Sequence, residues 1–209
     1  MRTIALVTQK GGSGKSTLAL GLAGAALECG ERVAILDTDP QGTIANWASR
    51  RNRPDPQVTP IALATELERA LRRLAQTDRT LAIIDTAAGA DSTVTATAMR
   101  SSDLCLLPSR PSIADIEASH VTVRVLQRWG KPFAFALNQA PARYDVQEAD
   151  PLHRLGVLAL PCIVLRNDHQ HAMAAGLTAC EWAPNGKAAQ ELRGLWTWTR
   201  QKLDCAAAA

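Results

Sequence analysis

The chain has 209 residues, of which 46% are apolar and 21% are charged, and this balance suits a globular protein with one sizeable core. No apolar run approaches the roughly 18–20 residues of a transmembrane helix, and no signal-peptide pattern precedes the first predicted strand, so we expect a cytoplasmic protein. A net charge of +3 permits contact with nucleic acid but does not by itself argue for it.

Strands and helices are predicted to alternate along the chain. The strand-forming runs are continuously apolar, which is typical of parallel strands buried on both faces. They lie at residues 2–7, 33–37, 81–85, 103–107, 133–137 and 157–165. Helical patterns lie near residues 16–29, 42–51, 63–76, 91–100, 113–129, 144–154, 168–176 and 187–203.

This order predicts an α/β fold with a doubly wound, mostly parallel sheet and helices on both of its faces. We expect a single domain over residues 1–205, followed by an alanine tail at residues 206–209. The proline-rich residues 53–60 are interpreted as a surface link within that domain.

A glycine-rich loop lies between the first predicted strand and the first predicted helix. Its residues 9–17 are Gln-Lys-Gly-Gly-Ser-Gly-Lys-Ser-Thr. In this context the glycines free backbone N–H groups to bind a polyphosphate, the lysine adds charge for the β- and γ-phosphates, and the serine can ligate Mg²⁺. The strict pattern has glycine in place of Gln9, and a second lysine, Lys10, lies inside the loop. The candidate phosphate-binding residues are Gly11, Gly12, Ser13, Gly14, Lys15, Ser16 and Thr17.

Three acidic residues follow or end the neighbouring predicted strands. Asp37 ends the second strand, Asp39 lies two residues beyond it, and Asp85 ends the third. Because parallel strands end at the sheet edge that also holds the phosphate loop, we expect all three acids beside the nucleotide. We assign Asp37 and Asp85, together with Ser16, to a Mg²⁺ site, and Asp39 to the water that attacks the γ-phosphate. The alternative is that an acid caps the helix that follows it.

These motifs resemble those of the ParA/MinD family of deviant Walker A ATPases, which are P-loop NTPases. Residues 10–17 are similar to the family's deviant Walker A box, 37–42 to its second motif, and 83–86 to its Walker B strand. Residues 107–112, 138, 176–181 and 186–189 also fit, so the likeness covers nearly the whole chain. The small size and residues 39–47 look most like the short, ParF-like ParA proteins of plasmid partition systems.

The resemblance implies an ATPase that uses ATP and Mg²⁺, with Lys10, Lys15 and Asp39 as catalytic residues. Lys10 would be the signature lysine, which reaches across an ATP-dependent homodimer to the phosphates bound by the other subunit. The alternative is that Lys10 contacts only its own ATP or solvent. Asn138 resembles the family asparagine that hydrogen-bonds adenine, and a loop-capping role for Asn138 is the alternative.

The family likeness also implies partners and a function. The expected function is DNA partition, in which an ATP-bound dimer binds nucleoid DNA non-specifically and is released when a ParB-like or ribbon-helix-helix adaptor stimulates hydrolysis. One alternative is a relative that positions a protein cargo, such as a carboxysome or a chemotaxis cluster, on the nucleoid. Another is a MinD-like membrane-associated ATPase, although no membrane contact is expected. An enzyme of the nitrogenase iron-protein type would need paired cysteines near the dimer axis. No cysteine follows the Walker B strand before Cys105, so the sequence does not favour this type of enzyme.

Basic residues and the last predicted helix bear on these alternatives. The basic residues form three groups along the chain. A solvated helix face is the simpler explanation of each group, and the third, C-terminal group is our first candidate for DNA contact. The helix at 187–203 has an apolar face that favours packing against the domain over membrane contact. The basic groups are Arg50, Arg51 and Arg53; Arg69, Arg72, Arg73 and Arg79; and Arg193, Arg200 and Lys202. The apolar face comprises Leu192, Leu195, Trp196, Thr199 and Leu203.

Overall fold

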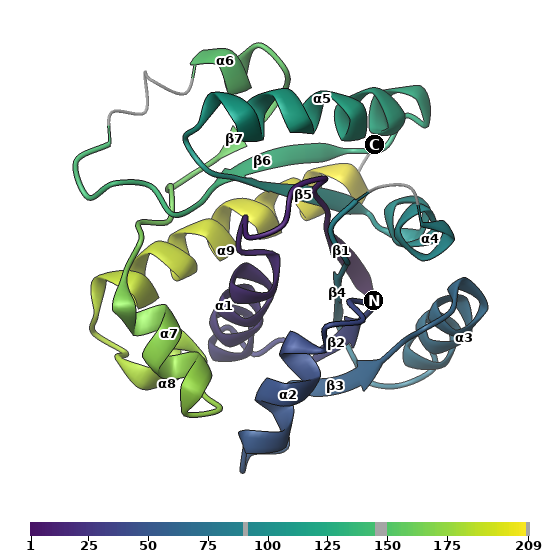
Figure 1. Ribbon diagram of the computed structural model, residues 1–209. Coiled ribbons are helices and arrows are strands. Elements are labelled where there is room, and N and C mark those ends of the chain that lie inside the picture. Colours follow the sequence, from purple (N-terminus) through teal and green to yellow (C-terminus); the bar gives the residue numbers. More distant parts are fainter. Residues whose placement is uncertain (90–91, 145–149, 208–209) are drawn as a thin grey trace.

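The described residues form one parallel β-sheet. The computed structural model describes residues 1–89, 92–144 and 150–207. The strands are β1 (Arg2–Leu6), β2 (Val33–Asp37), β3 (Gln57–Pro60), β4 (Leu81–Asp85), β5 (Leu104–Ser109), β6 (Phe133–Leu137) and β7 (Val157–Ala159). Their order is β3-β2-β4-β1-β5-β6-β7, and every neighbouring pair is parallel (Figure 1). This topology confirms the predicted doubly wound α/β fold.

Helices cover both faces of the sheet. They are α1 (Lys15–Glu28), α2 (Thr43–Arg50), α3 (Ala64–Leu74), α4 (Thr93–Ser101), α5 (Ile113–Arg128), α6 (Asp150–His153), α7 (Asn167–Ala174), α8 (Ala179–Trp182) and α9 (Lys187–Ala207). α1, α2, α7, α8 and α9 share one apolar cluster, and α3, α4, α5 and α6 share the other (Figure 1). In β1, Ile4 and Leu6 join the first cluster, whereas Ala5 joins the second. This burial on both sides explains why the strand sequences are continuously apolar.

Two strand predictions are wrong. Residues 53–60 are more than a surface link, because residues 57–60 form β3 beside β2. β3 is an edge strand that ends at Pro60, a position where the missing proline N–H breaks no ladder hydrogen bond. The strand predicted at 157–165 ends at Ala159, shortly before Pro161, and Val164 forms only an isolated bridge with Ala140.

The helix predictions agree with the structure apart from one omitted helix, and two of them extend into residues that the structure does not describe. Helix α8 was not predicted, although Thr178 and Glu181 form a capping box at its start, a pattern that is visible in the sequence. Of the helix predicted at 144–154, the structure describes α6, and residues 145–149 lie outside the described residues. Residue 91, the predicted start of the helix at 91–100, also lies outside them, and α4 begins at residue 93.

Helix α9 packs against α1, as its apolar face predicted. The five residues of that face are at most 2% exposed. The helices approach closely at Gly21 of α1, where an added Cβ would lie 2.4 Å from Leu192 Cδ2. The last helix is therefore part of the support for the helix that begins at the phosphate loop. α9 continues through Ala207, while residues 208–209 of the expected alanine tail lie outside the described part of the chain.

Both ends of the described chain lie at the amino edge of the sheet. β1 begins at Arg2, whose guanidinium forms an ion pair with Asp204 near the end of α9. Met1 and Leu203 line the same cavity, together with Pro132, the residue before β6. The loops that follow the strands lie at the opposite, carboxyl edge.

Candidate nucleotide-binding site

The glycine loop connects β1 to α1 at the carboxyl edge of the sheet. Gly12 and Gly14 have φ angles of 76° and 86°, which L side chains rarely adopt. The Gly14 carbonyl accepts the N–H of Leu18 at 2.9 Å and so begins the helical ladder. Left-handed residues within a loop that opens a helix gather backbone N–H groups into an anion-binding nest. The loop therefore has the backbone that phosphate binding requires.

Lys15 is the buried cation of this site. It is the first residue of α1 and is 7% exposed. Burial lowers the pKa of its ammonium group, while the carboxylates of Asp85 and Asp39 act in the opposite direction. A buried ammonium at the end of a glycine loop, within the electrostatic influence of two carboxylates, is suited to neutralise phosphate oxygens.

Ser16 and Asp85 form the part of the site that fits Mg²⁺. The Ser16 hydroxyl donates to Asp85 Oδ2 at 2.6 Å. Asp85 is fully buried, and its Oδ1 atom has no hydrogen-bond partner among the described residues. Burial raises the pKa of Asp85 to about 7. The hydroxyl oxygen of Ser16 and the unpartnered carboxylate oxygen of Asp85 are the kind of ligands that a hard divalent cation such as Mg²⁺ binds.

Asp37 and Asp39 have different surroundings. Asp37 is 2% exposed, and its two oxygens accept the N–H groups of Asp39 at 3.2 Å and of Ala45, in the first turn of α2, at 2.9 Å. Asp37 thus makes the capping contacts that were its alternative role, and its place in a metal shell stays a prediction. Asp39 is partly exposed, accepts the Gln41 N–H at 3.0 Å through Oδ1, and borders the nucleotide pocket.

Lys10 is paired within its own chain. Its Nζ lies 3.2 Å from Oδ2 of Asp115, and its side chain is 36% exposed. Asp115, in the first turn of α5, also accepts hydrogen bonds from Arg110 and from the Ser112 hydroxyl. Although burial alone would raise the pKa of Asp115, the hydrogen bonds from Arg110, Ser112 and Lys10 hold it below its ordinary value. The sequence did not indicate Asp115, because it lies 105 positions from Lys10.

Asn138 lies at the loop rather than facing an open pocket. It is 3% exposed, and its side-chain amide donates to the Ser13 carbonyl at 2.8 Å. The neighbouring Gln139 donates to the Gly12 carbonyl at 2.9 Å. A contact between Asn138 and adenine stays a prediction.

A pocket of about 230 Å³ opens beside the loop. It brings Lys15, Ser16 and Asp39 together, as predicted. Gln41 of the predicted second motif and Ala88, shortly after the Walker B strand, also line it, as do Thr43 and Met173, which the sequence did not indicate as site residues.

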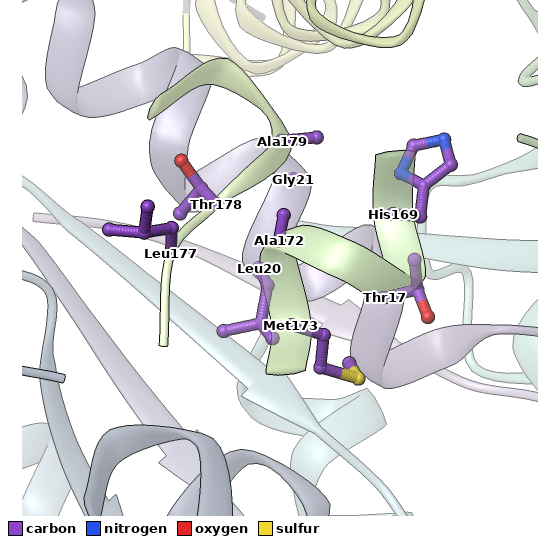
Figure 2. Close-up of a pocket in the computed structure, with 9 residues that line it drawn as sticks. All are labelled: Thr17, Leu20, Gly21, His169, Ala172, Met173, Leu177, Thr178 and Ala179. Carbon is purple, nitrogen blue, oxygen red and sulfur yellow. The ribbon is translucent and has the colours of Figure 1, made fainter. Parts of the chain in front are cut away.

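Met173 of α7 is shared with a second, smaller pocket. Figure 2 shows that pocket between α1 and the α7–α8 segment, where Met173 and Thr17 lie at the end nearer the loop. Its volume is about 10 Å³, enough for one water at most, so it is a packing gap rather than a nucleotide site.

Several residues of the three basic groups, for which a solvated helix face was the simpler explanation, form ion pairs within the chain. The Arg51 side chain is 4% exposed and pairs with Glu181 at 2.7 Å, and Arg53 pairs with the same carboxylate at 2.9 Å. Arg79 pairs with Asp55, and Arg193 with Glu28. Arg51 is therefore a structural residue that ties the end of α2 to α8.

The phosphate loop after the first strand of a parallel sheet, with an acid at the end of the adjacent strand, defines a P-loop nucleotide-binding protein. A family profile described as the CobQ/CobB/MinD/ParA nucleotide binding domain matches residues 4–123. The chain belongs to this family of nucleotide-binding proteins with the ParA/MinD ATPase fold, which confirms the resemblance inferred from its motifs.

Two curated relatives match over nearly their full length. Both are named maintenance of carboxysome distribution protein A. One, from Gloeobacter kilaueensis, is 30% identical over 210 residues and covers 97% of this chain and 94% of the relative. The other, from Halothiobacillus neapolitanus, is 26% identical over 198 residues, with 90% and 91% covered.

A solved structure supports the fold. The septum site-determining protein MinD from Pyrococcus horikoshii, complexed with Mg-ADP, superposes with a TM-score of 0.74 at 20% identity. The match covers all of this chain and 99% of that one. Within the part of the chain that the structure describes, no helix combines the length and the apolar character that crossing a bilayer requires.

Proposed function

We infer that this chain hydrolyses ATP with Mg²⁺ as an ATP-dependent dimer and uses that cycle to position a large protein cargo over nucleoid DNA. The observation that supports this most directly is the loop itself. It places Lys15 and Ser16 beside Asp85 and adds a second lysine, Lys10, at its entrance.

Hydrolysis is assigned to the carboxylates at the strand ends. Ser16 and Asp85 would hold Mg²⁺, which offsets the charge that develops on the phosphates. Asp39 borders the pocket and is only partly exposed, so it is our candidate to orient the attacking water. Lys15 would hold the β- and γ-phosphate oxygens through its buried ammonium group.

Dimer formation is inferred from the carboxyl edge of the sheet. Three exposed apolar side chains lie in segments that follow strands: Leu63 is 59% exposed, Ile113 77% and Leu165 65%. Exposed apolar side chains at the sheet edge that also holds a charged pocket are suited to contact a second copy of the same chain. Lys10 lies on this edge, and it would leave Asp115 to reach the phosphates of the partner subunit.

The choice of cargo rests on the two relatives that match along nearly the whole chain. Both names refer to carboxysome distribution, which supports protein cargo positioning, the earlier alternative, over plasmid partition. Non-specific DNA contact would use basic side chains that form no ion pair among the described residues. Arg69 and Arg73 on α3 and Arg200 on α9 are exposed and meet that condition. A small adaptor on the cargo would stimulate hydrolysis.

Light scattering coupled to gel filtration tests the ATPase dimer. The wild type should be monomeric without nucleotide and dimeric with ATP and Mg²⁺, and Lys15→Ala should stay monomeric because it does not bind the nucleotide. ATP-independent dimers would contradict the switch.

Deletion of the gene in its source cell tests the cargo. Mispositioned protein assemblies with normally inherited replicons support the proposal, whereas replicon loss with normally placed assemblies would replace it with DNA partition.

A further inference from the structure

Two side-chain amides hold the apex of the phosphate loop. Asn138 Nδ2 donates to the Ser13 carbonyl at 2.8 Å, and Gln139 Nε2 donates to the Gly12 carbonyl at 2.9 Å. Two consecutive donors at the end of β6 thus meet two consecutive acceptors in the loop.

The donors are themselves fixed. The backbone N–H of Asn138 donates to the Ser109 carbonyl, and that of Ala140 donates to Ile163, so the segment is tied on both sides. Gln139 has a φ of 55° and is the one non-glycine residue with positive φ in the described part of the chain. Such a conformation persists only where the surroundings impose it, and it is common at functional sites.

Gly14 makes room for this arrangement. A Cβ added there would lie 2.2 Å from Asn138 Nδ2, which no real contact allows. The glycine therefore has two reasons to be present: its φ of 86° and the approach of the Asn138 amide.

We propose that Asn138 and Gln139 are positioning residues that set the direction of the loop's peptide groups. A carbonyl turned toward bound phosphate would repel it, and a carbonyl that accepts an amide N–H from β6 is held away. The loop N–H groups are then left for the phosphates. This proposal rests on the proposed function, because it concerns the loop expected to bind ATP. It gives Asn138 a role at the phosphates in place of the adenine.

The two roles for Asn138 differ in the ligand they affect. A residue that reads the base matters for ATP but not for inorganic tripolyphosphate, which has no base. A residue that sets the loop matters equally for both ligands and leaves the preference for ATP over GTP unchanged.

Calorimetric titration with Mg-tripolyphosphate, Mg-ATP and Mg-GTP tests the proposal. Asn138→Ala should weaken tripolyphosphate and ATP by the same factor, about 10-fold, with the ATP-to-GTP ratio unchanged. Gln139→Gly, which keeps the positive φ without strain, should weaken both by about 3-fold, since its amide is partly solvated. Gln76→Ala, an exposed residue in the turn after α3, is the matched control and should bind like the wild type.

Two results would overturn the proposal. One is a loss of ATP affinity with tripolyphosphate affinity kept, and the other is unchanged affinity for both ligands. If Asn138→Ala fails to fold, Gln139→Gly tests the neighbouring contact, to the Gly12 carbonyl, from a partly exposed position. A wild type that binds tripolyphosphate but does not hydrolyse ATP would count against the proposed function alone.

Discussion

Replacing Asp85 by asparagine should stabilise the nucleotide-free protein above neutral pH and abolish its Mg²⁺-dependent nucleotide binding. Burial raises the pKa of Asp85 from the ordinary value of 3.8 to about 7. Between these two values the folded chain binds more protons than the unfolded chain at this residue. Its free energy of unfolding therefore falls as the pH rises from about 4 to about 7.

The size of the effect follows from that difference in pKa. About three pKa units correspond to about 4 kcal/mol at pH 8. Asparagine removes this cost and can still accept the Ser16 hydroxyl, but its NH₂ group would occupy the place of Oδ1, which has no partner. An unpartnered buried donor costs about 1–3 kcal/mol, which leaves a net gain of about 1–3 kcal/mol at pH 8. At pH 5 most of the gain disappears, because wild-type Asp85 is protonated.

Thermal unfolding with EDTA and without nucleotide measures the effect. At pH 8 Asp85→Asn should raise Tm by about 2–4 °C for each kcal/mol gained, and at pH 5 it should be no more stable than the wild type. Asp78→Asn is the control, since the Asp78 side chain is 74% exposed. An equal Tm change at both pH values, or a loss at pH 8, would refute the role of burial.

Three further substitutions test other contacts. Asp115→Asn should tighten the ATP-dependent dimer by about 30-fold, because the release of the two Lys10 side chains from Asp115 no longer costs about 1 kcal/mol each. A dimer Kd that is unchanged in light scattering would count against this reasoning. Asp39→Ala should slow ATP hydrolysis at least 10-fold, measured as released phosphate, so that the dimer stays in its ATP-bound state. A normal hydrolysis rate would show that another residue orients the water. Gly176→Ala should cost about 1–3 kcal/mol in urea unfolding, since φ is 68° and a Cβ would lie 2.7 Å from the α2 backbone. Gly130→Ala, with a φ of 61° but open space, separates strain from the clash.

The sequence predicted the parts of the site that are local in the chain. The loop, its flanking strand and helix, and the acids at the strand ends depend on short patterns with one physical explanation each. The edge strand β3 was missed because Pro60 suggests a turn, and only its place at the sheet edge makes proline acceptable.

Contacts between distant residues could not be predicted. Arg51 is a basic residue in an arginine-rich segment, and its partly buried partner Glu181 lies 130 positions away. The pairing of Lys10 with Asp115 and the contact of Asn138 with Ser13 are equally remote in sequence. Each depends on which loops the parallel sheet brings to the same edge, and that is known only once the strand order is known.

The position of the two chain ends has a practical consequence for labelling. Arg2 and Asp204 are paired at the amino edge, while the nucleotide pocket and the exposed apolar residues lie at the carboxyl edge. If two copies meet through their carboxyl edges, their ends point outward on opposite sides. A fluorescent protein joined at either end would then leave the nucleotide and the dimer surface uncovered, so both fusions should keep ATP-dependent dimer formation.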